Sequence, residues 1–380
     1  MRDGAAARRG GMTSRRLPFL PTPEEELLLK SIFLDGTAAI ESWTEWRKRT
    51  TVDGLDFPSQ RLLPLLYNRL NALGVAHPDV ERYKSVARYR WTENQLHLRQ
   101  TAHLLGLLNG IEANVLLLGG CALALLYYRD LGLRPVDDFS LLVPWTSVTE
   151  VMSRFASAGW KPERDAESTA LRPSVIVFHK KLHDIEPRLQ RHVLRDFYPE
   201  YPNDGFWGRS RTISVQDASV PTLGDTSQFF CVCAQGTGPD AIWAPHWVAD
   251  ALAILHGAQI DWHHLTNQVR VSGLVQRFRY ALAYLKETFA AAIPDSVIAE
   301  LAASPLSAAD RIEAILMRGQ ISPALTRAGH AYLQYRRNSR LPGSPASFLG
   351  HFQMRWGLCS PTHVLPEAVR RVARLWHKAA

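Results

Sequence analysis

Residues Leu117–Pro144 read LLGGCALALLYYRDLGLRPVDDFSLLVP, and this stretch decides the fold. An apolar segment typical of a buried strand is followed by a Gly-Gly turn and by a helix-like apolar stretch. An arginine comes next, and a carboxylate then enters a second strand-like segment. This order is typical of a phosphate-binding turn followed by a metal ligand.

The glycine pair is Gly119 and Gly120. Glycines between a strand and a helix let the backbone approach a phosphate closely, and the first N–H groups of the helix are free to bind the anion. A glycine pair after an apolar strand can also be an ordinary packing turn. When no other signal accompanies the pair, a packing turn is more frequent than a phosphate-binding turn.

Asp138 lies 18 residues after Gly120, at the start of the second strand-like segment. Mg²⁺ prefers oxygen ligands and keeps part of its coordination shell for water and substrate phosphates, so a carboxylate suits it here. An aspartate that only caps a turn is the alternative. Together with the glycine pair, Asp138 indicates metal-dependent phosphoryl transfer, in which the protein mainly positions groups and neutralises charge.

A metal site of this type needs a second carboxylate two residues later, where this chain has Ser140. A serine hydroxyl is neutral and is the poorer ligand. Asp137 is the nearest substitute, but neighbouring residues of a strand point to opposite faces. The sequence therefore indicates a fold and a class of ligand more firmly than it indicates turnover.

The composition is that of an ordinary globular protein, with 380 residues, 46% hydrophobic and 21% charged. The net charge of +8 is concentrated at the two ends, because residues 1–16 carry +4 and residues 327–378 carry +8. Four scattered cysteines predict reduced thiols. Neither a secretory leader nor an apolar run of about 20 residues is present, so we expect a cytoplasmic protein with no membrane partner.

The pattern along the chain predicts four segments. Helical spacing of apolar residues dominates before and after a shorter region in which strand-like and helix-like segments alternate. The expected segments are a disordered basic tail at 1–22, a helical N-terminal region at 23–113, an α/β core at 114–222 and a helical C-terminal region at 223–380.

The central motif resembles that of the uncharacterised nucleotidyltransferases, a family within the polymerase-β-like nucleotidyltransferase superfamily. Its members have a glycine turn, an arginine and then an Asp-x-Asp strand. Shorter stretches follow the family in the same order: RLLPLLYNRL, SAGWKP, DGFWGRS, HWVADALAIL and IDWHHL. The resemblance runs from about Leu27 to Leu301.

The resemblance implies a mixed α+β fold, with a small mixed sheet flanked by extensive N- and C-terminal helical regions. It also implies transfer of a nucleotidyl group from a nucleoside triphosphate to an unknown acceptor, with Mg²⁺ or Mn²⁺ as cofactor. Carried over to this chain, Asp138 and Glu186 are the catalytic and metal-binding carboxylates. The implied nucleotide-binding residues are Gly119, Gly120, Arg134 and Ser140, with Arg134 as a phosphate contact or as a partner for the acidic pair.

This chain departs from the family at several of these positions. Ser140 replaces the second aspartate, Glu186 is one methylene longer than the expected aspartate, Gly119 stands where many members have lysine, and Gln235 stands where we expect histidine. The alternative is therefore a catalytically degenerate member that binds a nucleotide, a peptide or a partner protein as an accessory factor.

Two weaker hypotheses concern other parts of the chain. Cys231 and Cys233 together with His246 have the residue types of a metal site, but their spacing fits no usual zinc pattern, and an apolar helix or strand face explains the cysteines more simply. The basic stretch from Arg327 onward has aromatic residues among its cations and is compatible with RNA or an acidic peptide, although no known nucleic-acid module is present.

Overall fold

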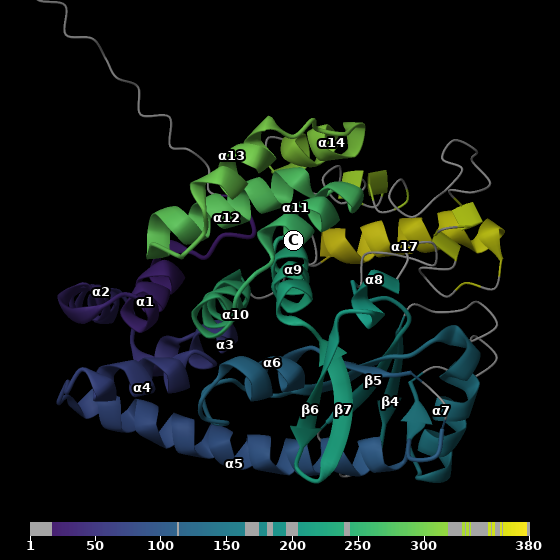
Figure 1. Ribbon diagram of the computed structural model, residues 1–380, viewed down its shortest axis with the longest axis horizontal. Coiled ribbons are helices and arrows are strands. Elements are labelled where there is room, and N and C mark those ends of the chain that lie inside the picture. The colour runs from purple at the N-terminus through teal and green to yellow at the C-terminus, as the bar shows by residue number, and fades with distance from the viewer. Residues whose placement is uncertain are drawn as a thin grey trace, which may run out of the picture.

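The computed structural model confirms a mixed fold of helices and strands, in which one seven-stranded sheet is flanked by helices. Figure 1 shows helices α9 to α14 on one side of the molecule and the long helix α5 on the other, with α6 and the sheet between them. The structure describes residues 17–111, 114–163, 175–180, 185–194, 204–238, 244–317, 329–330, 332–333, 335, 349–350, 352–353, 358 and 360–377.

The sheet has the strand order β3-β4-β5-β2-β1-β7-β6. The pairs β2–β5 and β1–β7 are parallel, and the other neighbouring pairs are antiparallel. The strands are β1 Leu116–Leu118, β2 Asp138–Leu142, β3 Lys161–Pro162, β4 Val175–His179, β5 Glu186–Gln190, β6 Ser210–Val215 and β7 Ala218–Leu223.

Helices precede the sheet, as the apolar spacing predicts. The first begins in a capping box, in which Oγ1 of Thr22 accepts a hydrogen bond from the backbone of Glu25 and the Glu25 carboxylate accepts one from the backbone of Thr22. These elements are α1 Pro23–Phe33, α2 Gly36–Arg49, the 3₁₀ turn η1 Val52–Gly54, α3 Phe57–Gln60, α4 Leu63–Ala72 and α5 Pro78–Gly106.

Three helices lie between strands of the sheet. Helix α6 Gly120–Tyr127 connects β1 to β2, α7 Trp145–Ser157 follows β2, and the short α8 Asp204–Trp207 precedes β6. The helices after the sheet are α9 Asp225–Gly236, α10 Ala244–Gly257, α11 Trp262–Val271, α12 Val275–Phe289, α13 Asp295–Ala303, α14 Ala308–Met317, the 3₁₀ turn η3 Pro361–His363 and α17 Val364–His377.

The two faces of the sheet belong to two hydrophobic cores. In β1, Leu117 packs into the core formed with α5, α6 and α7, whereas Leu116 and Leu118 pack into the larger core formed with α9 to α13. Strand β2 alternates in the same way, because Phe139 and Leu141 belong to the first core and Leu142 to the second. Asp138 and Ser140 therefore lie on the sheet face that the C-terminal helices approach.

The packed chain begins before the first helix. Phe19 is 3% exposed, its carbonyl oxygen accepts a hydrogen bond from Nε1 of Trp247 at 3.0 Å, and its ring meets that indole edge to face. Phe19, which we assigned to the tail, is thus packed against α10, while residues 1–16 lie outside the described part of the chain. Within the described residues, no helix combines the length and apolarity that crossing a membrane requires.

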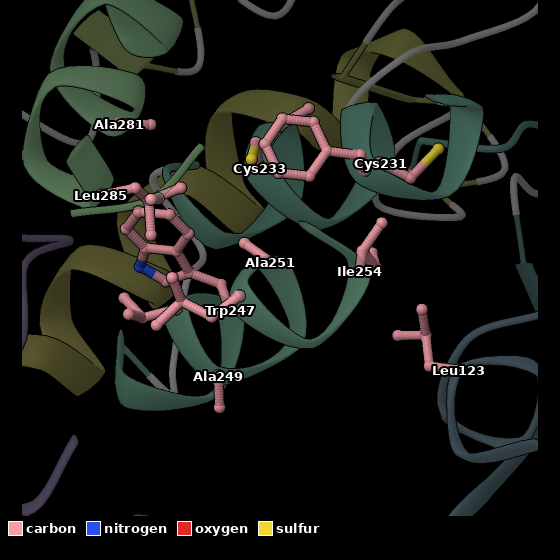
Figure 2. Close-up of a cluster of buried hydrophobic side chains, with 14 of the residues drawn as sticks. Leu123, Cys231, Cys233, Trp247, Ala249, Ala251, Ile254, Ala281 and Leu285 are labelled. Carbon is pink, nitrogen blue, oxygen red and sulfur yellow. The ribbon is translucent and has the colours of Figure 1, made fainter. Parts of the chain in front are cut away.

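Trp247 also fixes the packing of the C-terminal helices on one another. Figure 2 shows it in the larger core together with Cys233 of α9, Ala251 of α10 and Leu285 of α12. The last residue of α9 is Gly236, and a Cβ atom added there would overlap Cβ and Cγ of Trp247. The close approach of α9 and α10 therefore requires a residue without a side chain at position 236.

Replacing this glycine tests the helix contact. We expect Gly236→Ala to lower the free energy of unfolding by about 1–3 kcal/mol, because the added methyl group forces Trp247 or a helix backbone to move. Gly106→Ala is the matched control, since Gly106 also ends its helix and a Cβ there meets no atom within 4 Å. The control should be neutral or stabilising by up to about 1 kcal/mol in urea denaturation. Equal effects of the two substitutions would contradict the predicted clash.

Candidate functional site

The carboxylates predicted to act together are brought together by strand register. In the parallel pair β2–β5, Asp138 is the partner of Glu186, so their side chains leave the sheet next to each other on the same face. In the antiparallel pair β1–β2, Leu118 is the partner of Ser140, which places the turn after β1 beside Asp138. The sequence separates these groups by up to 67 residues, and the sheet joins them at one edge.

The turn needs both of its glycines. Gly119 has φ +74° and ψ −149°, a backbone conformation that is essentially restricted to glycine. A Cβ atom at Gly119 would lie 3.5 Å from Oδ2 of Asp138, and one at Gly120 would overlap Nη1 of Arg134. The Asp138 carboxylate therefore lies next to the glycine pair.

The N-terminus of α6 begins at this turn. Its first N–H groups have no partners within the helix, and the N-cap residue, Gly119, has no side chain that could cap them. The partial positive charge of a helix N-terminus favours an anion. The turn can accept a phosphate here, provided that the nearby carboxylates are neutralised by a cation.

A cation already lies between the carboxylates. Nη1 of Arg188 is 3.4 Å from Oδ2 of Asp138, and Nη2 is 3.1 Å from Oε2 of Glu186. The side chains of Asp138 and Glu186 are 19% and 44% exposed, so the pair is open to solvent on its Glu186 side. Nδ1 of His179 on β4 lies 3.8 Å from Oε1 of Glu186. Two carboxylates thus share one positive group beside the glycine turn.

The two positions considered for the second carboxylate do not supply one to this site. Ser140 is buried, and its hydroxyl donates a hydrogen bond to Oδ2 of Asp138 at 3.0 Å. Asp137 forms an ion pair with the buried guanidinium of Arg61, away from Asp138. The opposite orientation of neighbouring strand residues, which argued against Asp137, accounts for this placement.

Arg134 has a carboxylate partner from a distant helix. Its Nε lies 2.7 Å from Oδ1 of Asp250 on α10, its Nη2 lies 2.9 Å from Oδ2, and the hydroxyl of Tyr128 donates to the same Oδ1 at 2.7 Å. The two charged side chains are 17% and 9% exposed. Two of the three guanidinium nitrogens are therefore used to hold α10, and the third, Nη1, lies against Gly120.

The surroundings of this pair keep both of its members charged. Burial by itself would raise the pKa of Asp250, but the Arg134 guanidinium and the two hydrogen-bond donors outweigh burial and hold that pKa below its ordinary value of 3.8. Burial would lower the pKa of Arg134, and Asp250 raises it instead. The pair ties the glycine turn to the C-terminal helices as a buried, charge-assisted contact.

Sequence reasoning missed two of these residues. Arg188 follows Glu186 by two positions in a strand-like segment, and this alternation is a signal that places it on the same face. Asp250 offered no such signal, because HWVADALAIL reads as an apolar helix with one acidic residue, and its partner Arg134 is 116 residues away. Only the tertiary structure connects them.

The proposed cysteine site is an apolar core region. Cys231 and Cys233 are buried, and burial raises the pKa of both thiols, which disfavours the thiolate form that binds metals. Nε2 of His246 lies 3.0 Å from the carbonyl oxygen of Pro58, and burial lowers its pKa to about 4. Across the described residues, no group of three or more His, Cys, Asp or Glu side chains is arranged to hold a metal ion.

The remaining departures lie elsewhere. Nε2 of Gln235, at the position where the family resemblance led us to expect histidine, donates a hydrogen bond to the carbonyl oxygen of Val193 at 3.1 Å. It thereby connects the end of α9 to the segment that follows β5. Most of the basic stretch from Arg327 onward lies outside the described residues, so the suggestion of RNA or an acidic peptide as its ligand stays a prediction.

Comparison with models of protein families gives a match for this chain. A family model described as an uncharacterised nucleotidyltransferase matches residues 58–290, which is more than half of the chain and includes the glycine turn, both carboxylates and Asp250. Among curated proteins, none matches the chain significantly.

The buried Arg134–Asp250 pair yields a stability prediction. Asp250→Asn should lower the free energy of unfolding by about 3–5 kcal/mol, because it leaves a buried guanidinium uncompensated. Asp53→Asn is the control, since Asp53 pairs with Arg82 at an exposed position and should cost less than about 1 kcal/mol. Both changes are measured by urea denaturation at pH 7. A cost below about 1 kcal/mol for Asp250→Asn would contradict this account of the pair.

The same pair should give the chain a specific sensitivity to acid. Because the pKa of Asp250 is lower in the folded protein than its ordinary value of 3.8, the pair stabilises the fold above that pH and loses this contribution as the pH falls below it. The stability difference between the wild type and Asp250→Asn should therefore shrink below pH 3.8. A difference that stays constant to pH 2 would show that Asp250 titrates normally.

Proposed function

The chain belongs to the family of uncharacterised nucleotidyltransferases, and from this premise we propose that it binds a nucleoside triphosphate and transfers its nucleotidyl group to an acceptor hydroxyl. One observation carries the proposal: Asp138 and Glu186 are register partners on adjacent strands and share a cation next to a glycine turn. Family membership by itself supports the fold and the class of reaction, and the site supplies the argument for the ligands.

The donor set suits Mg²⁺ or Mn²⁺ at the carboxylate pair. The Arg188 guanidinium, with contacts of 3.4 and 3.1 Å to the two carboxylates, stands in for a cation and supports the view that both oxygens can serve one positive centre. Mg²⁺ is commonly held by one or two carboxylates together with substrate phosphates. When bound, such an ion would neutralise phosphate charge and stabilise the leaving group. Asp138 and Glu186 are the residues that would hold it.

The residues of the chain divide the remaining tasks. The Gly119–Gly120 turn and the first N–H groups of α6 bind the triphosphate, and Arg134 keeps the turn in place through its contact with Gly120. In the transfer step, the acceptor oxygen forms a bond to the α-phosphorus, the bond from that phosphorus to the bridging oxygen breaks, and pyrophosphate leaves with its electron pair. Glu186, the more exposed carboxylate, receives the acceptor proton.

An accessory role without transfer is the second candidate, and Ser140 favours it. Its hydroxyl donates to Asp138 at 3.0 Å, in a position where a two-metal site needs a carboxylate. In this version the same turn and the same carboxylates bind a nucleotide, a peptide or a partner protein, and no nucleotidyl group is transferred.

Labelling with α-phosphate-labelled nucleotides distinguishes these candidates. Incubation of the protein with each labelled triphosphate, Mg²⁺ or Mn²⁺ and cell extract should label an acceptor, and Asp138→Asn should reduce labelling by roughly 10²–10³-fold. Asp217→Asn is the matched control, because Asp217 lies in the β6–β7 turn at the opposite end of the sheet and should leave labelling unchanged.

The contrary results separate the two candidates. Nucleotide binding without labelling under any of these conditions would reject transfer and support the accessory role. Labelling that survives Asp138→Asn would place the chemistry at another site. Loss of labelling in both variants would mean that the effect of Asp138→Asn is not specific to the carboxylate pair.

A further inference from the structure

Arg188 is placed by β5 on the same face as Glu186, and it is the one cation that contacts both members of the carboxylate pair within the described chain. Its strand partner in β2 is Ser140, so Arg188 lies beside the position where the family has its second aspartate. The side chain is 26% exposed. Arg188 is thus held by the sheet at its backbone, and its side chain is partly exposed to solvent.

The charge of the site differs from that of a two-metal site. Asp138, Glu186 and Arg188 together carry one net negative charge, whereas three carboxylates without an arginine would carry three. Three clustered carboxylates repel one another strongly and require two divalent ions to become attractive to a triphosphate. A net charge of −1 becomes positive when a single divalent ion binds. The loss of a carboxylate at Ser140 and the presence of Arg188 therefore change the site in the same direction.

The guanidinium is chemically suited to replace an ion. Its planar set of N–H donors matches phosphate oxygens in two parallel hydrogen bonds, and it carries its charge at every physiological pH. Its contact with Asp138 is long, at 3.4 Å, and its contact with Glu186 involves a carboxylate that is 44% exposed, so neither contact is strong. Contacts this weak cost little free energy to exchange for the oxygens of a triphosphate.

We propose that Arg188 takes the place of the second metal ion: it bridges Asp138 and Glu186 in the free protein and moves to the triphosphate when one divalent ion binds to these carboxylates. This inference rests on the proposed binding of a nucleoside triphosphate at the glycine turn. It adds a role for Arg188 and predicts that one divalent ion, not two, binds at the site. Because Arg188 and the ion bind the same two carboxylates, they compete until the nucleotide provides the guanidinium with new partners.

The competition gives a pair of effects with opposite signs. Removing the charge with Arg188→Gln should strengthen binding of Mn²⁺ to the free protein by roughly tenfold, since a like charge no longer occupies the site. The same variant should weaken binding of the triphosphate in the presence of Mn²⁺ by roughly tenfold or more, since a charge-assisted contact to phosphate is lost. If Arg188 only stabilised the contact between β2 and β5, its replacement would not raise the affinity for Mn²⁺ while lowering the affinity for the triphosphate.

The experiment measures Mn²⁺ binding by electron paramagnetic resonance and binding of a non-hydrolysable nucleoside triphosphate by calorimetry, on the full chain. Arg188→Lys keeps the charge but not the planar donors, so it should bind Mn²⁺ like the wild type and bind the triphosphate more weakly. This variant also keeps the test decisive if Arg188→Gln does not fold. The saturated wild-type complex should contain one Mn²⁺ per chain, and Ser140→Asp combined with Arg188→Gln should contain two.

Two sets of results would overturn the inference. If the wild type binds the triphosphate but contains two Mn²⁺ per chain, or if Arg188→Gln changes neither affinity, Arg188 is not a substitute for an ion and the proposed function stands without it. If the wild type binds no triphosphate with or without Mn²⁺, the proposed function fails and the role of Arg188 fails with it.

Discussion

The parallel register between β2 and β5 is the constraint on which the site depends. It makes Asp138 the neighbour of Glu186 and Ser140 the neighbour of Arg188, with all four side chains on one face. A slip of one residue would turn the carboxylates of one strand into the core that holds Phe139 and Leu141. Burial of these apolar side chains on the opposite face therefore fixes the register, and the site gains its geometry from the hydrophobic core beneath it.

A second constraint joins the site to the C-terminal helices. Arg134 lies next to Gly120 in the turn and forms an ion pair with Asp250 of α10, and the hydroxyl of Tyr128 donates a hydrogen bond to the same carboxylate. Helix α10 is in turn packed against α9 through the close approach of Trp247 to Gly236. The glycine turn is thus supported from the helical region that follows the sheet.

The sequence predicted individual strands and helices correctly where the local pattern of apolar residues is strong. The apolar runs that end before Gly119 and begin at Asp138 predict two strands, and both form, while the first helix begins at Pro23 as expected. The pairing of Asp138 with Glu186 came from family resemblance, because strand order depends on long-range packing that no local pattern encodes. The ion pair between Arg134 and Asp250 could not be predicted from the sequence for the same reason. Arg188 was accessible through its alternation with Glu186, but without the register its proximity to Asp138 could not be known.

The central claim is that the departures of this site from the family form a consistent set, in which an arginine and one ion do the work of two ions. The most direct measurement is a crystal structure of the full chain with a non-hydrolysable nucleoside triphosphate and Mn²⁺, with the ions located by their anomalous scattering. The account predicts one Mn²⁺ on Asp138 and Glu186 and the Arg188 guanidinium on the triphosphate. Arg188 still bridging the two carboxylates beside bound nucleotide, or two ions at the site, would contradict it.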